Sequence, residues 1–205
     1  MTSQAKTWLT PDQVQQLRNA CLSAEVPTYL QDHRQALLEL LYDTGLRRAE
    51  VAQLNVENLN LDGETATVYL PGEIQKRLPS GDLRSDATLA LSDRTRNVLR
   101  RYLRDRWRDP DPDSGPLFPT RSSDRITGKS VNRAVKRLAE IAQVEPERVG
   151  RGEADWSDVS AHTLRHSVAY RIIVQEGGRL EDVQMRLRHR SRQVTDQLYS
   201  HLVPR

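Results

Sequence analysis

The sequence predicts an α+β fold that is mostly helical and carries one small three-stranded antiparallel sheet. Apolar residues recur at three- and four-residue spacing over most of the 205 residues, which is the pattern of helices packed on a core. Only the stretch between Leu59 and Leu91 is rich in β-forming residues and hairpin signals. Because helical and strand segments do not alternate, α+β is favoured over α/β.

The first helix has a clear start. Thr10 can cap it, Pro11 suits the first turn, and Gln13 completes a capping box. Cys21 lies on the apolar face of this helix, which favours core packing over catalysis. It is the only cysteine, so no intrachain disulfide can form and a reducing compartment is the simplest setting.

A helix, a tight turn and a second short helix are expected next. Apolar residues at positions 36, 37, 40 and 41 have helical spacing, and Thr44-Gly45 ends the helix. A further helical turn is expected from Arg47 to Leu54.

The sheet is indicated by turn chemistry and β-forming residues. Asp62-Gly63 is a hairpin signal, and strands are expected over Thr65–Leu70 and Thr88–Leu91. We expect Lys76 in the second connection of this sheet or in a strand of it.

The remainder is expected to be helical with two interruptions. A basic helix opens at Ser92-Asp93 and reaches about Trp107, and the proline-rich run Asp109–Pro119 is a loop. Residues 144–158 are polar and expected to be irregular. Further helices are expected over 130–143, 161–175, 179–187 and 192–202.

Composition limits the classes of function. The net charge is +3 and the sequence pI about 9.2, and 27 of the 31 basic residues are arginine. The planar guanidinium group of arginine binds phosphate through two hydrogen bonds. A genome that favours arginine over lysine would give the same composition. No stretch approaches the roughly 20 apolar residues that cross a bilayer. We expect a cytoplasmic protein without membrane contact.

The segment TGLRRAEV is the first of four clusters with chemical potential. Gly45 permits a sharp bend, and Arg47 opens the following helix. Backbone N–H groups at a helix start and a guanidinium can converge on one anion. The alternative is a helix hairpin with solvated arginines.

The second cluster places His162, Arg165 and His166 on one helical face. Two histidines four residues apart also suit a zinc-binding helix. The glutamate that follows the first histidine in zinc proteases is missing, and the cationic Arg165 would repel a metal. We therefore expect no metal here.

The other two clusters lie near the C-terminus. Leu187-Arg188-His189-Arg190 is a basic stretch before the last helix, and a solvated loop is its simplest alternative. Tyr199 lies on a short amphipathic helix, where a tyrosine more often packs than reacts.

Order and spacing together resemble the tyrosine recombinases, the phage integrase type of DNA strand-transfer enzyme. The resemblance runs from Thr10 to His201 and combines HxLRH, LxH after some 20 residues, and TxxxYxH. The segments that carry it are TGLRRAEV (44–51), the hairpin with Lys76, HTLRH (162–166), LRH (187–189) and TDQLYSH (195–201).

The resemblance implies a catalytic set. It comprises Arg47, Lys76, His162, Arg165, His189 and the nucleophile Tyr199, with Glu50 as a supporting residue behind Arg47. Two positions depart from the family pattern. Lys76 lacks the glycines that usually surround it, since the segment reads Gly72-Glu73-Ile74-Gln75-Lys76-Arg77, and Arg188 stands where the family usually has glycine.

By this resemblance the chain is a site-specific recombinase or integrase. Tyr199 attacks a DNA phosphate and forms a 3′-phosphotyrosyl ester, so neither ATP nor a metal or other cofactor is needed. Arg47 and Arg165 clamp the non-bridging oxygens, with hydrogen bonds from the two histidines. Lys76 gives the leaving 5′-oxygen its proton, and a base near Tyr199, with His162 as candidate, accepts the phenolic proton.

The resemblance also implies partners and domain limits. The expected partner is double-stranded DNA, which would place the protein at the nucleoid. Self-association on DNA as a dimer or tetrameric synapse is also expected, with an accessory DNA-binding protein as a further candidate. Residues 1–205 are expected to be a catalytic domain without the N-terminal core-binding domain of relatives, so unaided binding should be weak and salt-sensitive. Two alternatives remain: relaxation of DNA as by type IB topoisomerases, and a DNA-binding accessory factor without turnover.

Overall fold

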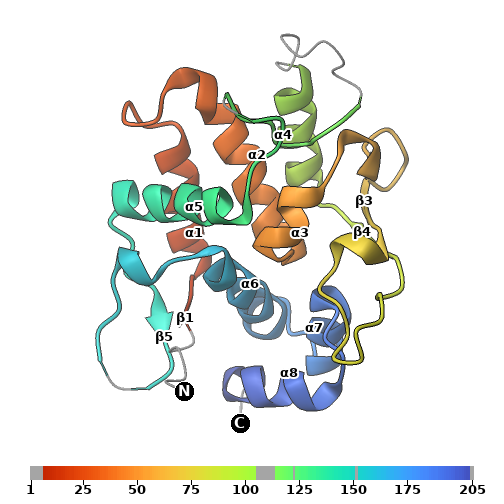
Figure 1. The fold of residues 1–205 in the computed structure, drawn as a ribbon. Coiled ribbons are helices and arrows are strands. Elements are labelled where there is room, and N and C mark those ends of the chain that lie inside the picture. Colours follow the sequence, from red (N-terminus) through yellow and green to blue (C-terminus); the bar gives the residue numbers. More distant parts are fainter. Residues whose placement is uncertain (1–6, 105–113, 122, 151, 204–205) are drawn as a thin grey trace.

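The computed structural model describes residues 7–104, 114–121, 123–150 and 152–203, which form a helical body with two small sheets (Figure 1). The predicted α+β class is confirmed. Within these ranges the α-helices are α1 (Pro11–Cys21), α2 (Thr28–Thr44), α3 (Arg48–Gln53), α4 (Asp93–Arg104), α5 (Gly128–Ala142), α6 (Ala161–Tyr170), α7 (Leu180–Leu187) and α8 (Arg192–Tyr199).

The start of α1 is built as the sequence predicts. The backbone N–H of Thr10 donates to Oε1 of Gln13 at 2.8 Å, and the N–H of Gln13 donates to Oγ1 of Thr10 at 3.4 Å. Cys21 at the end of the helix is fully buried, which confirms its packing role. Burial raises the pKa of its thiol to about 12.

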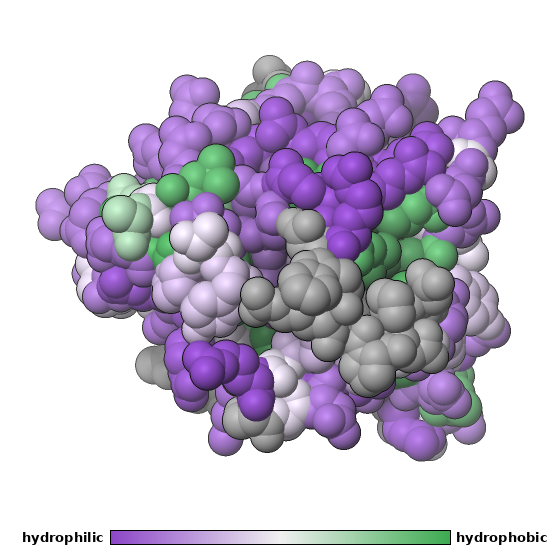
Figure 2. Space-filling view, turned by 90° about the horizontal axis from the view of Figure 1, so that it is seen from above, coloured by the Kyte–Doolittle hydropathy of each residue, from purple (hydrophilic) through white to green (hydrophobic). Residues whose placement is uncertain are grey.

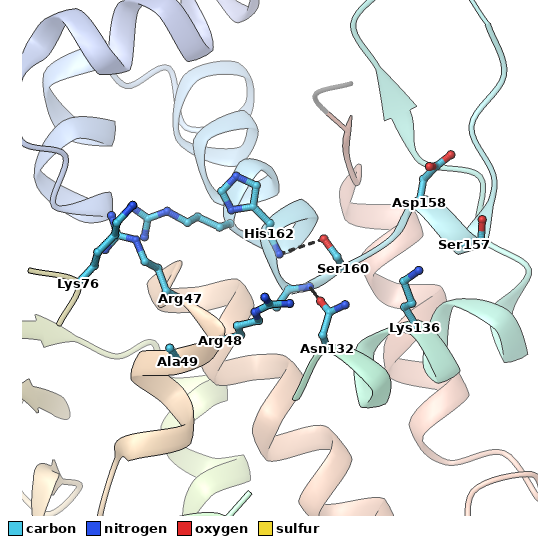
Figure 3. A pocket seen from close by; sticks show the side chains of 12 residues that line it. Arg47, Arg48, Ala49, Lys76, Asn132, Lys136, Ser157, Asp158, Ser160 and His162 are labelled. Atoms are coloured by element: carbon cyan, nitrogen blue, oxygen red, sulfur yellow. Dashed lines mark hydrogen bonds between the residues drawn. The ribbon is translucent and has the colours of Figure 1, made fainter. Parts of the chain in front are cut away.

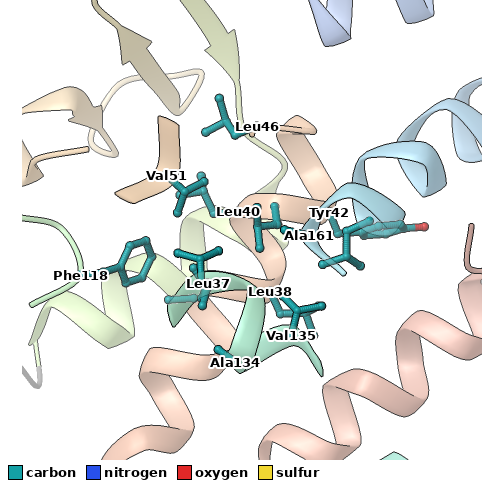
Figure 4. Close-up of a cluster of buried hydrophobic side chains, with 14 of the residues drawn as sticks. Leu37, Leu38, Leu40, Tyr42, Leu46, Val51, Phe118, Ala134, Val135 and Ala161 are labelled. Atoms are coloured by element: carbon teal, nitrogen blue, oxygen red, sulfur yellow. The ribbon is translucent and has the colours of Figure 1, made fainter. Parts of the chain in front are cut away.

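Helix α2 runs through the middle of the molecule and packs against α1, α4 and α6. Every residue from Ala36 to Thr44 is buried. Figure 4 shows apolar side chains of α2, among them Leu37 and Leu40, meeting side chains of α3, α5 and α6. This large apolar cluster supports the turn at Gly45 and helix α3, which follow α2.

The turn after α2 confirms the role expected of Gly45. This residue is left-handed, with φ 64°, and its N–H donates to the carbonyl of Leu41 at 2.9 Å. A Cβ at this position would overlap Cδ2 of Leu187 at the end of α7. Glycine therefore lets the α2–α3 turn and α7 approach each other closely.

The three-stranded sheet is present as predicted. Strands β2 (Leu59–Asn60), β3 (Thr67–Leu70) and β4 (Ala87–Ala90) pair antiparallel in that order, with Val68 opposite both Leu59 and Leu89. Lys76 lies in the connection between β3 and β4.

A second sheet was not predicted. Strands β1 (Thr7–Trp8) and β5 (Glu147–Arg148) pair antiparallel, with Thr7 opposite Arg148. The expectation that residues 144–158 are irregular is therefore wrong at β5 and at the 3₁₀ turn Trp156–Asp158. Strands of two residues are too short to leave an alternating pattern in the sequence.

The C-terminal helices agree with the predicted segments. After α6 the chain continues through a π-helical turn, Arg171–Gln175, before α7 and α8. A 3₁₀ turn, Ser200–Leu202, follows α8. The predicted extension of α4 to Trp107, and residues 109–113 of the predicted loop, lie outside the described residues.

One face of the surface is largely hydrophilic, with small and separate hydrophobic patches (Figure 2). Among the described residues, no helix has the length and apolar character required to cross a membrane.

Candidate active site

A cavity of about 670 Å³ lies where α3, α5 and α6 meet the β3–β4 connection. Lys76, Arg47 and His162 lie toward one end of it and Lys136 toward the other (Figure 3). Arginine and lysine side chains outnumber the single carboxylate of Asp158, so the cavity suits an anionic ligand. Its basic lining residues are Arg47, Arg48, Lys76, Lys136, His162 and Arg165.

Arg47 is held at the start of α3 by Glu50. The backbone N–H of Arg47 donates to Oε2 of Glu50 at 2.7 Å, and its Nη1 donates to Oε1 at 2.9 Å. Glu50 is only 1% exposed. Although burial favours the neutral acid, Arg188 and Arg47 lower the pKa of Glu50, so it acts as a fixed negative support.

Arg165 is buried in α6 and held by backbone carbonyls from two other segments. Its Nη1 donates to Gly45 and its Nη2 to Leu187. Burial, and then the nearby Arg47, lowers its pKa to about 9. The guanidinium therefore stays cationic at neutral pH, and its two carbonyl contacts fix its position.

His162 lies in the first turn of α6. Ser160 caps this helix, because its Oγ accepts from the N–H groups of His162 and Thr163, both at 3.2 Å. The surrounding protein, and then Arg165, Arg47 and Arg48, lower the pKa of His162. The imidazole is thus mostly neutral near pH 7 and can accept a proton.

Tyr199 lies at the end of α8 and is 2% exposed. Its hydroxyl shares a hydrogen bond of 2.8 Å with Nδ1 of His166. Burial raises the pKa of the phenol to about 12, although Arg165 and Arg47 oppose the shift. Tyr199 is therefore close enough for both guanidinium groups to affect its pKa, but it is not among the residues that line the cavity.

His189 lies between α7 and α8. Its ring stacks on Tyr199 with centroids 5.9 Å apart, and its Nδ1 shares a hydrogen bond of 3.0 Å with Oγ1 of Thr195. Burial, and then Arg165 and Arg47, lowers its pKa to about 3. Like Tyr199, it approaches the cationic groups from the side of α8.

Lys76 is exposed, and its backbone is anchored on both sides. The buried side chain of Gln75 donates to the carbonyls of Leu70 and Ser85, at 3.1 and 2.9 Å. The carbonyl of Lys76 accepts from Nε of Arg84 at 2.9 Å. These contacts hold the lysine-bearing connection beside the cavity.

The predicted residues therefore fall into two groups. Arg47, Lys76, His162 and Arg165 line one cavity, with Glu50 behind Arg47. His189, in the segment between α7 and α8, and Tyr199, at the end of α8, form a second group beside it. Their catalytic roles remain predictions.

Sequence reasoning missed the contact between His166 and Tyr199. His166 was considered only as a metal ligand, although its position four residues after His162 puts both rings on one face, with centroids 4.4 Å apart. Within the described residues, no group of three or more histidine, cysteine or acidic side chains could hold a metal ion. The pairing of Arg188 with Glu50 was also missed.

Comparison with known proteins places the chain in a family. Residues 7–205 match the phage integrase family. The chain is 32% identical over 194 residues to tyrosine recombinase XerD of Haemophilus ducreyi, covering 95% of this chain and 57% of that protein. It is 34% identical over 178 residues to tyrosine recombinase XerC of Xanthomonas axonopodis pv. citri, covering 87% and 49%. The chain belongs to the phage integrase family.

Solved structures share the fold. The crystal structure of XerA recombinase matches with a TM-score of 0.71 at 20% identity, covering all of this chain and 66% of that one. XerH site-specific recombinase in a pre-cleavage complex with its difH substrate matches with a TM-score of 0.69 at 21% identity, covering 97% and 52%. The chain spans a little over half the length of the XerD relatives it matches.

Proposed function

We propose that this chain cuts and rejoins DNA as a site-specific tyrosine recombinase, with Tyr199 as nucleophile. The observation that carries the proposal is the cavity in which Arg47 and Arg165 approach each other, beside a tyrosine whose pKa both of them influence. Two fixed guanidinium groups suit the negative charge that builds on phosphate oxygens when a fifth ligand joins phosphorus.

In the proposed reaction, the phenolic oxygen of Tyr199 attacks the phosphorus and the bond to the 5′-oxygen breaks. The leaving 5′-oxygen takes a proton from Lys76, and the DNA 3′ end stays bound as a phosphotyrosyl ester. Attack by another 5′-hydroxyl reverses these steps and rejoins the strand. The ester preserves the energy of the broken bond, so the cycle is balanced without a cofactor.

The phenolic proton needs an acceptor. His166 contacts the phenol directly at 2.8 Å, and the ring of His162 lies next to that of His166. We propose that the proton passes to this histidine pair, with His166 as the first contact and His162 as the group open to the cavity.

The buried phenol must become accessible before it can react. Tyr199 is 2% exposed, whereas the basic groups line an open cavity. Helix α8 packs mainly against α7. We propose that DNA in the cavity is accompanied by a shift of α8 that brings the hydroxyl to the phosphorus, with the histidine pair accepting the phenolic proton as the hydroxyl moves.

The partner in this proposal is duplex DNA, bound by more than one copy of the chain. A dimer would cut both strands of one site, and a tetrameric synapse would exchange strands between two sites. Support for the DNA partner comes from the basic lining of the cavity and from the similar fold of the Tn1549 transposon integrase, which was solved in complex with transposon right end DNA.

A nicked suicide substrate tests the function. When a short fragment diffuses away after cleavage, the covalent protein–DNA ester accumulates and migrates as a shifted band on a denaturing gel. Wild type should form this adduct and Tyr199→Phe should not, while both bind DNA equally in a mobility-shift assay. An adduct formed by the Phe variant would refute the nucleophile. Relaxation of supercoiled plasmid without any preferred site would instead indicate a topoisomerase.

A further inference from the structure

Arg188 ends α7 in a conformation that usually belongs to glycine. Its φ is 53° and its ψ 48°, and its N–H donates toward the carbonyls of Gln184 and Met185. A non-glycine residue in this left-handed region costs on the order of 1 kcal/mol. The chain therefore keeps an arginine at a position where glycine would be free of this strain.

The side chain of Arg188 is mostly buried and lies near Arg47 and Arg165. It is 9% exposed, and its Nη2 lies 2.6 Å from Oε2 of Glu50. Its Nε and Nη1 are buried without a hydrogen-bond partner among the described residues. Burial also lowers its pKa, although Glu50 opposes the shift. Backbone strain, burial of a charge and unpaired donors all reduce the stability that Arg188 contributes. Such costs are typical of residues retained for function.

Glu50 connects Arg188 to the cavity. Its Oε2 accepts from the backbone of Arg47 and from Arg188, and its Oε1 accepts from Nη1 of Arg47. One carboxylate thus lies between two guanidinium groups. With both oxygens occupied, its orientation is fixed, and so is that of the Arg47 side chain.

The backbone of Arg188 connects to Lys76. Its carbonyl accepts from Nη1 of Arg84 at 3.1 Å, and Nε of Arg84 donates to the carbonyl of Lys76 at 2.9 Å. Arg188 therefore contacts both Glu50, which holds Arg47, and Arg84 in the connection that carries Lys76. The backbone link does not need the arginine side chain, so the two connections can be tested separately.

We propose that the Arg188 side chain is a positioning residue for DNA cleavage, which acts through Glu50 to keep Arg47 aimed into the cavity. The inference rests on the proposed function and deepens it. Arg188 is absent from the residues that line the cavity. It therefore acts on the phosphate through the carboxylate and the first arginine.

The proposal predicts how the cleavage rate depends on pH. Burial acts to raise the pKa of Glu50, and the groups that overcome this are Arg188 first, then Arg47 and Arg165. Removing the charge at position 188 takes away the largest of these contributions, so the pKa of Glu50 must rise. As pH falls through that raised value, Glu50 becomes neutral and Arg47 loses its ionic support. The acid side of the rate profile should move to higher pH.

Three substitutions separate charge from conformation. Arg188→Met keeps the left-handed strain and most of the length but removes the charge, Arg188→Gly removes both strain and charge, and Arg188→Lys keeps a charge. Single-turnover cleavage of the suicide substrate should slow about tenfold in the Met and Gly variants, a common effect for a group that orients another. Both should show the shifted acid limb, and the Lys variant should largely restore its position.

Two results would overturn the inference. One is a wild-type rate and pH profile in both Arg188→Met and Arg188→Gly. The other is a slower rate that follows the folded fraction measured in urea, with no change in the pH profile, because that pattern reports a structural role only.

A titration that does not depend on activity separates this inference from the proposed function. Glutamate labelled with ¹³C at its carboxyl carbon, with Glu50→Gln to assign the signal, gives the pKa of Glu50 directly. Its rise in Arg188→Met is expected whether or not the substrate is cut, and an unchanged value would contradict the link. A wild-type chain that forms no adduct would refute the proposed function alone.

Discussion

The two hydrophobic clusters of the molecule support different halves of the candidate site. The larger one extends from Leu9 to Leu164 and joins α1 to α6, and the elements on it carry Arg47 and His162. The smaller one contains Tyr199 itself, with residues of α6, of the π-helical turn and of α7. The groups that would receive the phosphate are therefore built on the main core, whereas Tyr199, the proposed nucleophile, belongs to a small neighbouring cluster.

This difference matters for the proposed reaction, because the buried Tyr199 has to reach a phosphate held by groups on the main core. Local opening free energies range from nearly zero to the global value, and a small cluster separates at lower cost than a central core. The phosphate clamp can stay preorganised while α8 moves.

The clamp on the main core should dominate the rate. Arg47→Ala should reduce single-turnover cleavage by about 10² to 10³, the range for losing one fixed donor to a developing oxyanion. Arg47→Lys should recover little, because a point charge cannot replace a planar fork. Arg137→Ala, which removes only exposed ion pairs with Glu25 and Glu140, is the control and should cleave at the wild-type rate. A loss below threefold in Arg47→Ala would contradict the role of the clamp.

Gly45 lies where the two clusters meet, so a substitution there should affect stability. Gly45→Ala should lower the free energy of unfolding by about 3 kcal/mol, because a left-handed alanine is strained and its Cβ overlaps Leu187. Gly81→Ala is the matched control: its φ is also positive, at 93°, but nothing lies within 4 Å of a Cβ there. Urea denaturation measures both. Equal losses would mean that the overlap with α7 contributes nothing.

These residues also show how far the sequence could predict the molecule. The capping box at Thr10, the break at Gly45 and the sheet rest on signals within a few residues, and all three were predictable. The order of the motif segments predicted four residues that line the cavity, Arg47, Lys76, His162 and Arg165, because the resemblance carries long-range information that local patterns lack.

The remaining features depend on contacts between distant segments. Strand β1 pairs with β5 about 140 residues later, and two residues cannot specify a partner. The hydroxyl of Tyr199 on α8 contacts His166 on α6, 33 residues earlier, and this contact depends on how the two helices pack. Arg188 could be recognised as unusual, but its partner Glu50 lies 138 residues earlier. Sequence indicated the chemistry of the site without its resting geometry.

A pair of equal truncations compares the two clusters directly. Val135 on α5 and Val183 on α7 are both almost fully buried. Each Val→Ala change removes two methyl groups, worth about 1.5 kcal/mol at roughly 0.8 kcal/mol per buried group. In hydrogen exchange, Val183→Ala should speed exchange in α7 and α8 alone, whereas Val135→Ala should lower protection throughout the core. Uniform loss in both variants would mean that the two clusters unfold as one.

The smallest effect concerns two histidines with the same pKa, about 3, in different clusters. Burial is the main cause in both. His33 lies against Phe118 in the main core, and Arg34 also lowers its pKa. The pKa of His189 is lowered in addition by Arg165 and Arg47. In the unfolded chain both titrate near 6.5, so each contributes stability that is full above about pH 6.5 and is lost as pH falls toward 3.

Binding of DNA should change the pKa of His189 but not that of His33. A phosphate in the cavity offsets the charge of Arg165 and Arg47, so the pKa of His189 should rise, while His33 is remote from the cavity and should not respond. Proton–carbon NMR of Tyr199→Phe with a duplex, which avoids cleavage, can follow both rings from about pH 8 down to about pH 4. Over that range a ring with a pKa near 3 stays mostly neutral, and a ring whose pKa has risen begins to protonate. His33→Gln and His189→Gln assign the signals. If both histidines moved, the change would report a general loosening of the fold. If neither moved, no phosphate would lie near the guanidinium groups, and the clamp would have to be sought elsewhere on the surface.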